Sequence, residues 1–373
     1  MNFQPLTDFL DSLPREVGTP GLSCMVSFRH EPVYEHHTGY KDAAGTLPPD
    51  RDTLYNIYSV TKLFTCSAVL QLMERGNFLL YDPIWKYLPE FRHMKYWDEK
   101  GEVCELMGDI TIENLMTMTS GLNYDLENPL LLAMKEKTQG RCPTRETICA
   151  LSEQVLDFRP GTRWQYSFSH DVLGALIEAV SGMTLGEYMQ KNIFEPLGMK
   201  DTGFMRTPEK EARMAAQYHY NFNTNRAEQV PLDNQFKLGT EYESGGAGLI
   251  SSLRELMIFA EGLGSGKVIR PQTLALMQTN RLTPEMMARD FTWTQHTGYG
   301  FGLGGAVMVD CVRGSSLGHT GELTWHGAAG SNIWVDPAGE VSIAYTQQVI
   351  YGNMPYYLPR LRNLVYFCLD QKD

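Results

Sequence analysis

The sequence contains no closely spaced pair of cysteines. Its 373 residues include 7 cysteines, and none of them forms a Cys-x-x-Cys arrangement. Closely spaced thiols are typical of structural zinc sites and of dithiol redox motifs, so neither kind of site is expected. Scattered cysteines in odd number are typical of reduced thiols, and a cytoplasmic location is therefore the expectation.

The chain also lacks blocks of basic residues and long apolar runs. Asp and Glu number 44 against 32 Lys and Arg, which gives a net charge of -12. Since nucleic acids and anionic membranes bind basic patches, neither is expected as a partner. No uninterrupted apolar run approaches the ~18 residues of a membrane-spanning helix. The first residues show no basic segment followed by an apolar one, so no secretory signal is expected.

What the chain does contain is a globular composition, with 43% hydrophobic residues, and a clear division of secondary-structure patterns. Strand patterns occur towards both ends of the chain, and helical patterns dominate the middle. The expected strands lie within residues 21–40, 299–309, 331–335 and 341–349. The expected helices include residues 3–13, 59–75, 112–118, 171–180 and 358–369. Residues 218–234 are expected to form a long polar loop.

Strands at both ends with helices between them predict an α+β fold in two parts. Residues 1–76 and 245–373 are expected to build one sheet domain, and residues 77–244 a mainly helical domain. Ligand pockets commonly form where two domains meet. A functional site is therefore expected between these two parts of the chain.

Ser59 and Lys62 form a Ser-x-x-Lys sequence at the start of a helical pattern. On a helix, positions three apart share a face, with Cβ atoms roughly 5–6 Å apart. A lysine at its ordinary pKa of ~10.4 cannot take a proton from serine at neutral pH, but burial and polar neighbours lower that pKa. Ser59 is thus a candidate nucleophile and Lys62 its base. In the alternative, Ser59 caps the helix, Lys62 is solvated, and no partner elsewhere is required.

Two later segments contain candidate partners for this pair. Tyr166 precedes a helix that is expected to begin near Ser169. A loop tyrosine is usually a half-buried aromatic side chain, but a phenol beside an ammonium group can share its proton in acid–base steps. Further on, the Gly-rich segment HTGELTWHGAAGSNIWVDP leads into a strand. Exposed backbone N–H groups in such a turn are suited to holding an oxyanion.

These segments, in this order, resemble the serine β-lactamase and penicillin-binding protein superfamily, and within it most closely the family VIII carboxylesterases. The resemblance covers most of the chain. It includes the motifs LYNIYSVTKLFT, DITIENLMTMTSGL, RPGTRWQYSFSHDVLGALIEAVSG, SGGAGLISSLRELM and WHGAAGSNIWVDP. It implies an antiparallel sheet that is built from both chain ends and flanked by helices, with the active site beside a mainly helical second domain.

The resemblance also implies a role for each candidate residue. Ser59 would be the acylated nucleophile, Lys62 the base and Tyr166 the second acid–base group. The backbone N–H groups of Ser59 and Ala328 would hold the oxyanion. No metal ion or organic cofactor is implied, and the sequence does not reveal the oligomeric state.

Two positions depart from the pattern of the β-lactamases. Phe168 stands where those enzymes carry asparagine, and Trp325 where they carry lysine or histidine. Loss of a cation that pairs with a substrate carboxylate disfavours β-lactams and D-alanyl peptides. The expected activity is therefore hydrolysis of small carboxylic esters. The alternatives are β-lactamase, D-aminopeptidase or D-alanyl carboxypeptidase activity and, in another class, a catalytically silent binding or scaffold protein.

The candidates for contact with the substrate lie in these motifs or close to them. The role of His326 is left open between contact with the substrate and a hydrogen bond within its own turn. The candidates are Trp325, His326, Gly327, Phe168 and Tyr124, with residues 242–244 as further candidates.

Three other motifs receive non-catalytic interpretations. His319-Thr320-Gly321 also matches the third family motif, but Trp325-His326-Gly327 is preferred because the residues after it have the spacing that the resemblance implies. Gly314–Gly318 matches the Gly-x-Ser-x-Gly motif of α/β-hydrolases, but no helical pattern follows, so a loop is expected. His36 and His37 are adjacent in a strand and point to opposite faces, so a metal pair is not expected.

Overall fold

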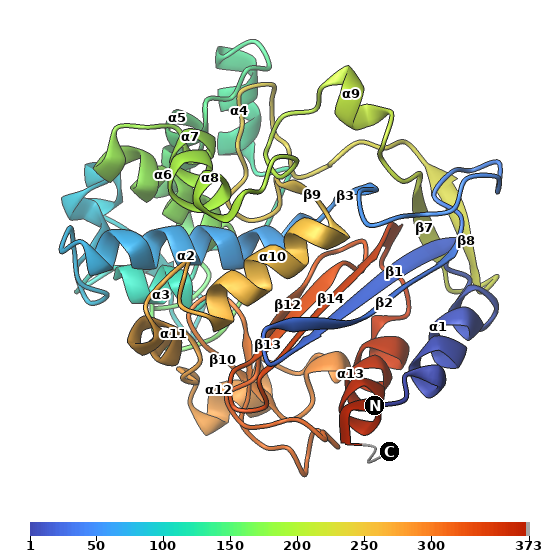
Figure 1. The fold of residues 1–373 in the computed structure, drawn as a ribbon. Coiled ribbons are helices and arrows are strands. Elements are labelled where there is room, and N and C mark those ends of the chain that lie inside the picture. Colours follow the sequence, from blue (N-terminus) through green and yellow to red (C-terminus); the bar gives the residue numbers. More distant parts are fainter. Residues whose placement is uncertain (371–373) are drawn as a thin grey trace.

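A seven-stranded antiparallel sheet forms the centre of the computed structural model, which describes residues 1–370 (Figure 1). Its strands in spatial order are β10 (Tyr299–Phe301), β11 (Ala306–Met308), β12 (Leu323–His326), β13 (Asn332–Asp336), β14 (Val341–Gln347), β1 (Gly21–Phe28) and β2 (Glu31–Gly39). Strands from the two ends of the chain are neighbours, because β1 pairs with β14. The expectation of one antiparallel sheet built from both chain ends is confirmed.

Alternating residues of β1 enter two different hydrophobic cores. Cys24 and Val26 belong to one core and Met25 to the other, as expected for a strand that is buried on both faces. The first core lies between the sheet and two helices, α1 (Gln4–Glu16) and α13 (Met354–Asp370). These helices come from opposite ends of the chain and lie side by side (Figure 1).

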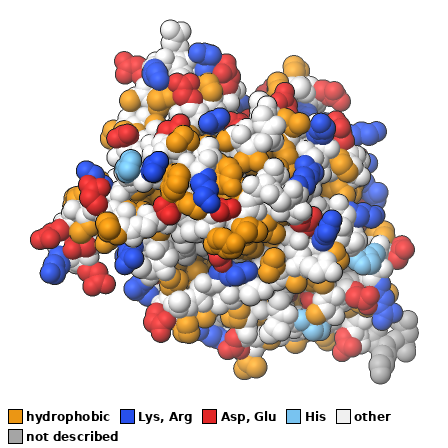
Figure 2. All heavy atoms as spheres, turned by 90° about the vertical axis from the view of Figure 1, so that its left-hand side faces the viewer, with side chains coloured by type: hydrophobic (Ala, Val, Ile, Leu, Met, Phe, Trp, Pro, Cys, Tyr) orange, Lys and Arg blue, Asp and Glu red, His pale blue; other side chains and the backbone are white. Residues whose placement is uncertain are grey.

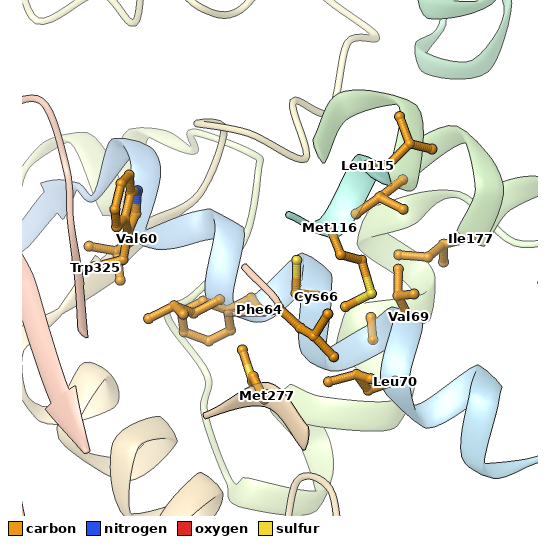
Figure 3. Packing of buried hydrophobic residues seen from close by; sticks show 14 of the residues in the cluster. Val60, Phe64, Cys66, Val69, Leu70, Leu115, Met116, Ile177, Met277 and Trp325 are labelled. Carbon is orange, nitrogen blue, oxygen red and sulfur yellow. The ribbon is translucent and has the colours of Figure 1, made fainter. Parts of the chain in front are cut away.

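The second core surrounds helix α2 (Thr61–Glu74), which is buried along most of its length. Apolar side chains occur all around this helix, the pattern of a helix enclosed on every side. Figure 3 shows Phe64, Val69 and Leu70 of α2 among side chains of neighbouring elements, including Ile177. Burial of one such side chain contributes roughly 1.5–3 kcal/mol. α2 is therefore held firmly at the centre of the molecule. Its neighbours include α6 (Ser169–Ser181), α7 (Leu185–Met189) and α10 (Leu253–Gly264).

The remaining elements are short. The helices are α3 (Ile112–Met116), α4 (Pro129–Lys137), α5 (Thr144–Cys149), α8 (Glu195–Leu197), α9 (Pro208–Glu211), α11 (Pro271–Met277) and α12 (Pro284–Arg289). In the small sheets, β3 (Leu54–Asn56) pairs with β9 (Ile250–Ser252), and β4 (Lys95–Trp97) pairs with β5 (Val103–Glu105) and β6 (Val155–Leu156). The core around α2 contains residues of both expected domains, and the division at residues 76 and 244 stays a prediction.

Most expected elements are confirmed with shifted ends. The helices expected over residues 3–13 and 358–369 correspond to α1 and α13. The strand expected over residues 299–309 is divided into β10 and β11 by a turn. In this turn Gly304 has a φ of 102° and lies against α2, where a Cβ would come within 2.5 Å of Cys66 Sγ. The close approach of the turn to α2 therefore breaks the strand.

The loop expected over residues 218–234 is instead a β-hairpin, so this prediction was wrong. β7 (Gln217–Asn221) and β8 (Arg226–Val230) pair antiparallel, and β15 (Val349–Ile350) joins β7 in parallel. Asn221 Oδ1 accepts two backbone N–H groups of the connecting turn. β8 is polar and largely exposed, and in β7 only Tyr218 and Tyr220 alternate with polar residues, which is too short a pattern to mark a strand in the sequence.

Figure 2 shows acidic and basic side chains interspersed on the face that lies at the left of Figure 1. Among residues 1–370, no helix has the length and apolar character that crossing a bilayer requires. Within the same residues, no group of three or more His, Cys, Asp and Glu side chains is arranged to hold a metal ion.

Candidate active site

Ser59 lies in a tight turn between strand β3 and the buried helix α2. The chain leaves β3, passes through the 3₁₀ turn Tyr58–Val60 and enters α2 at Thr61. Tyr58 has a left-handed backbone with a φ of 45°, and its Oη donates a hydrogen bond of 2.6 Å to Gln217 Oε1. A non-glycine residue in this conformation typically costs ~1–3 kcal/mol and persists only where its surroundings enforce it. The strained turn places Ser59 at the wall of a cavity.

The structure brings the three predicted catalytic side chains into contact. Ser59 Oγ is hydrogen-bonded to Tyr166 Oη, and Lys62 Nζ donates to Ser59 Oγ at 3.3 Å. Lys62 is fully buried and also donates to the carbonyl of Gly246 at 2.7 Å. Its nitrogen lies 4.4 Å from the centroid of the Tyr166 ring. The alternative with a solvated lysine is therefore excluded.

Tyr166 reaches Ser59 from the loop before α6. The backbone beside it is fixed, because the N–H of Gln165 donates to the carbonyl of Met118 at 2.9 Å. Its ring packs against two indoles, with centroid distances of 5.5 Å to Trp293 and 6.1 Å to Trp325. Helix α6 starts at Ser169, as the sequence predicted. The phenol is thus held from the backbone side and from its ring face.

Asp171 is a buried carboxylate near Lys62 that the sequence did not single out. Its Oδ1 accepts hydrogen bonds from Tyr242 Oη at 2.9 Å and Ser244 Oγ at 2.7 Å. Its Oδ2 has no partner among the described residues and lies beside the bare Cα of Gly246. A Cβ at that glycine would come within 2.6 Å of Oδ2 and 3.3 Å of Lys62 Nζ. Asp171 therefore holds the turn whose carbonyl binds Lys62.

An acidic residue in the apolar first half of a helix was the available signal for Asp171. The helix segment SHDVLGALI is otherwise free of carboxylates, and its first residues are buried. Residues 242–244, which were further candidates for contact with the substrate, lie outside the lining of the cavity. Tyr242 and Ser244 are buried against Asp171 and do not line the cavity beside Ser59.

Burial controls the protonation of the groups around Lys62. Desolvation raises the pKa of the Asp171 carboxyl, although the nearby Lys62 opposes this effect. Desolvation also raises the pKa of the Tyr124 phenol well above its ordinary value. For His170, desolvation and then the charge of Lys62 lower the pKa to about 3. This imidazole is therefore neutral at physiological pH and adds no charge beside Lys62 and Asp171.

A cavity of about 600 Å³ opens beside Ser59. Of the predicted substrate contacts, Tyr124, Trp325 and His326 line it, and Ala328 lies in the same wall. The described residues of its lining include no Asp, Glu, Lys or Arg. Because a charged ligand would lose hydration there without gaining an opposite charge, the cavity suits an uncharged ligand.

Phe168 and Gly327, two further predicted contacts, lie behind the cavity wall rather than in it. Phe168 is 1% exposed and packs against Tyr124 with ring centroids 4.6 Å apart, because the start of α6 turns its side chain into the core. At Gly327 a Cβ would come within 2.2 Å of the carbonyl oxygen of Ile57. Glycine thus lets the end of β12 approach the turn of Ser59 and brings Ala328 to the cavity. The role of the Ala328 N–H stays a prediction.

His326 contacts two side chains that sequence reasoning missed. Its Nδ1 lies 3.2 Å from Nε2 of His296, and its Nε2 lies 3.3 Å from Nε2 of Gln295. Both partners come from the segment after α12, where no motif marks them. The hydrogen bonds of His326 therefore go to a distant segment and not to its own turn, and its contact with the substrate stays a prediction.

The competing motifs lie away from Ser59. His319 is half exposed and its Nδ1 is 2.8 Å from Asp336 Oδ2, outside the lining of the cavity. Gly314–Gly318 lies in the loop between β11 and β12, in agreement with the loop interpretation. His36 bonds to Asp11 of α1 whereas His37 bonds to Ser23 and Glu35. Neighbouring imidazoles therefore bind different partners.

Comparison with known proteins places this geometry in a family. Residues 6–360 match the Beta-lactamase family. Esterase EstB of Burkholderia gladioli is 31% identical over 379 residues, covering 95% of this chain and 93% of the esterase. Monacolin J acid methylbutanoyltransferase of Aspergillus terreus is 32% identical over 356 residues, covering 87% and 84% of the two chains.

A solved structure agrees with this relationship. That of EstCE1, a hydrolase with promiscuous acyltransferase activity, is similar with a TM-score of 0.80 and 26% identity. The similarity covers 98% of this chain and 97% of EstCE1. Together with the antiparallel sheet and the helices on its faces, these matches confirm the expected β-lactamase-like fold. The chain belongs to the Beta-lactamase family.

Proposed function

We propose that the protein hydrolyses small carboxylic esters through an acyl-enzyme formed on Ser59. The observation that carries the proposal is the contact of Ser59 Oγ with both Tyr166 Oη and Lys62 Nζ. A serine hydroxyl becomes a strong nucleophile when a neighbouring group takes its proton. Lys62 and Tyr166 both contact Ser59 Oγ, so either group can take up or return this proton.

In the proposed reaction, Ser59 Oγ attacks the carbonyl carbon of the ester, and its proton moves to the Lys62–Tyr166 pair. The backbone N–H groups of Ser59 and Ala328 hold the oxyanion that forms. When the carbonyl re-forms, the bond to the alcohol oxygen breaks and Tyr166 gives the alcohol its proton. Water then attacks the acyl-enzyme, the same groups carry its proton back to Ser59 Oγ, and the acid is released. This sequence uses no cofactor.

Esters fit the cavity better than β-lactams or D-alanyl peptides. The fully buried indole of Trp325 stands where β-lactamases carry a cation, and no charged side chain occurs among the described residues of the lining. A substrate carboxylate would therefore lose hydration without a counter-charge. The esterase EstB, at 31% identity, supports the same choice.

Acyl transfer to an alcohol is a second candidate function. It is favoured by two relatives, the methylbutanoyltransferase of Aspergillus terreus and EstCE1, a hydrolase with promiscuous acyltransferase activity. A cavity of about 600 Å³ has room for an acyl group and an acceptor, since small-molecule sites measure ~300–1,000 Å³. Excess butanol in the assay, with chromatography of the products, separates transfer from hydrolysis. Butyl ester as a minor product would leave hydrolysis as the main reaction.

Turnover of p-nitrophenyl butyrate and nitrocefin by wild type, Ser59→Ala and Ser316→Ala tests the proposal. Ester turnover is expected in wild type and in Ser316→Ala, which alters an outlying loop, and its loss is expected in Ser59→Ala. Unchanged ester turnover in Ser59→Ala would overturn the proposal. Strong nitrocefin turnover without ester turnover would favour the β-lactamase alternative.

Labelling with a fluorophosphonate probe, followed by mass spectrometry, distinguishes a serine hydrolase from a catalytically silent binding or scaffold protein. Labelling at Ser59 is expected in the folded protein. A folded chain with no label and no turnover would indicate a binding or scaffold protein.

We also propose that the protein acts in the cytoplasm without nucleic-acid or membrane partners, in line with its net charge of -12. Cell fractionation tests this location, and recovery with membranes would contradict it.

A further inference from the structure

One wall of the cavity consists of uncharged hydrogen-bonding side chains. Thr292, Thr294 and Gln295 come from the segment after α12, and His326 comes from the end of β12. Each of these side chains can donate or accept a hydrogen bond without carrying a charge. Thr292 and Thr294 are exposed, Gln295 is half-buried and His326 is buried, so polar groups of a ligand find hydrogen-bonding partners along this wall.

Another wall of the same cavity is apolar. Phe236 belongs to a hydrophobic cluster against which Tyr124, Leu126 and Ala328 pack. The rings of Tyr124 and Phe236 are stacked, with centroids 5.4 Å apart and an interplanar angle of 18°. Alkyl and aryl groups are favoured on such a surface because their transfer from water is favourable. The cavity therefore offers one apolar part and one polar, uncharged part.

The imidazole of His326 is held rigidly and without charge. Its Nδ1 bonds to His296 Nε2 at 3.2 Å, and the ring of His296 stacks on the indole of Trp325 at 5.1 Å with an angle of 1°. Burial, and to a smaller extent the charge of Lys62, lowers the pKa of His326 to about 4. His326 Nε2, which lies 3.3 Å from Nε2 of Gln295, is thus a neutral hydrogen-bonding group at the cavity.

The position of Tyr166 indicates that the alcohol half of the ester lies towards the polar wall. In the proposed reaction Tyr166 gives its proton to the departing alcohol, so the alcohol oxygen lies at Tyr166 Oη. The Tyr166 ring packs on Trp293 and Trp325, and the ring of Trp293 lies 5.9 Å from that of His326. The atoms of the alcohol beyond its oxygen therefore pass the half-buried indole of Trp293 towards His326 and Gln295.

We propose that the preferred substrates are esters of an apolar acid with a polyhydroxylated alcohol, whose free hydroxyl groups bind His326 and Gln295. This proposal rests on the proposed function and names the substrate class of the same site. A hydroxyl group both donates and accepts, so it pairs with a neutral imidazole and an amide. A hydroxyl beside His326 Nε2 and Gln295 Nε2 makes hydrogen bonds that an alkyl group cannot make, so the site is expected to discriminate against the analogue that lacks it.

The values of kcat/KM for glyceryl monobutyrate and propyl butyrate test the proposal. The two esters share the acid and a three-carbon alcohol and differ in two hydroxyl groups. Wild type is expected to prefer the glyceryl ester by about tenfold, the effect of one or two hydrogen bonds. His326→Phe keeps an aromatic ring but no hydrogen-bonding atom, so the preference should disappear through a higher KM for the glyceryl ester. Gln295→Met should act in the same direction.

Leu126→Ala on the apolar wall is the matched control, and it should lower turnover of both esters while keeping the preference. Equal kcat/KM for the two esters in wild type, or a preference that survives in His326→Phe, would overturn the proposal. An equal loss for both esters in His326→Phe would show a purely structural role and also overturn it.

Three other esters separate this proposal from failure of the proposed function and from recognition of a hydroxyl in the acid half. p-Nitrophenyl butyrate has no free hydroxyl in its leaving group, so His326→Phe should lower its kcat/KM less than that of glyceryl monobutyrate. Absence of its turnover in wild type would refute the proposed function itself. Methyl 3-hydroxybutyrate against methyl butyrate places the hydroxyl in the acid half. A His326-dependent preference seen only in that pair would overturn the assignment to the alcohol.

Discussion

Two buried clusters of charged and phenolic side chains differ in how completely their polar atoms are paired. The site cluster, Lys62, Tyr124 and Asp171, lies beside Ser59. Within residues 1–370 it leaves Tyr124 Oη and Asp171 Oδ2 without a hydrogen-bond partner. An unpaired buried polar group typically costs ~1–3 kcal/mol. Such a penalty is expected where the requirements of a site, and not stability, decide the arrangement.

The anchor cluster, Tyr299, Glu322, Arg362 and Tyr366, joins α13 to the sheet and is fully paired. Arg362 Nη1 donates to Tyr299 Oη at 2.8 Å, and Tyr299 Oη donates to Glu322 Oε1. Tyr366 Oη lies 2.6 Å from Asp336 Oδ2 and 3.2 Å from Glu322 Oε2, and these two carboxyl groups share its one proton. None of these four side chains has a buried polar atom without a partner. Both clusters bury charged groups. The site cluster therefore differs from the anchor cluster in the hydrogen bonding of its polar atoms and not in its charge.

Removing the amine of the site cluster should have the largest effect. Lys62→Met keeps a buried side chain of similar length but takes away the group that bonds to Ser59 Oγ. We expect kcat for p-nitrophenyl butyrate to fall by roughly 10²–10⁴-fold, the usual contribution of a positioned acid–base group. Labelling of Ser59 by a fluorophosphonate probe should slow in parallel. Retained turnover in Lys62→Met would remove the distinction between the clusters.

Breaking the anchor cluster should affect stability and leave the chemistry intact. Arg362→Met removes the charged donor to Tyr299 Oη and a positive charge that acts on the buried Glu322, and the free energy of unfolding should fall by roughly 1.5–3 kcal/mol in urea titrations. The kcat of the folded variant should stay close to that of wild type. Arg360→Met, an exposed cation on the same helix, is the control and should change stability little. A fall in kcat for Arg362→Met alone would place the anchor cluster in the mechanism.

Neutralising the carboxylate of the site cluster should have an intermediate effect. Asp171→Asn keeps the shape of the side chain but weakens its hydrogen bonds to the turn whose carbonyl binds Lys62. The value of kcat/KM should therefore fall by roughly 10–100-fold, the usual effect of weakening hydrogen bonds to a charged group. Loss of a negative charge near Lys62 and Tyr166 should also move the acid limb of the pH profile to lower pH. Ser244→Ala removes one hydrogen bond but keeps the charge, so its profile should not move. Identical profiles for both variants would mean that Asp171 acts only on stability.

The pH dependence of stability sharpens the comparison at His170, which lies beside the site cluster. Its folded-state pKa of about 3 lies below the ordinary value of 6.5, so on acidification the unfolded chain takes up the proton first. The stability that depends on the neutral imidazole is therefore present above pH 6.5 and is lost as the pH falls towards 3. Wild type should lose up to ~1.4 kcal/mol per pH unit more than His170→Asn in this window.

Urea titrations of both proteins at several acidic pH values provide this measurement. The raised pKa values of Asp171 and Glu322 act in the opposite sense, since their protonated forms are favoured in the folded state. They do so equally in wild type and variant, and the difference between the two slopes isolates His170. Parallel slopes would show that this histidine does not resist protonation.

A pair of single-atom deletions should give the smallest effects, of opposite sign. Tyr124→Phe removes an unpaired hydroxyl, and the free energy of unfolding should rise by up to about 1 kcal/mol. Tyr299→Phe removes a paired hydroxyl of the anchor cluster, and the free energy of unfolding should fall. Calorimetry of the two variants provides the measurement. A change of the same sign in both would contradict the proposed difference in pairing.

The family resemblance alone placed Tyr166 beside Ser59, which lies 107 residues away in the sequence. The contact of Ser59 with Lys62 could be predicted because its determinants are local, since both residues lie at the start of the same helical segment. The sheet from both chain ends was predictable for a similar reason, because buried strands such as β1 show apolar residues in the local pattern. Patterns within a short window were sufficient for both.

The remaining parts of the site depend on contacts between segments far apart in the sequence. Asp171 shows its role only when Tyr242 and Ser244 fold against it, and His326 only when His296 arrives from another loop. Phe168 was expected to face the substrate, but the direction of α6 turned it into the core. A pattern within a short stretch of sequence shows neither these long-range contacts nor the orientation of the Phe168 side chain.

The pairing of Leu22 in β1 with Gln347 in β14 has a consequence for biosynthesis. A chain emerging from the ribosome contains Ser59 long before it contains the indole and the backbone amide that complete the cavity wall. The sheet closes only after β14 has been translated, so the nascent polypeptide is expected to stay inert towards cellular esters. Prematurely terminated fragments should be equally harmless.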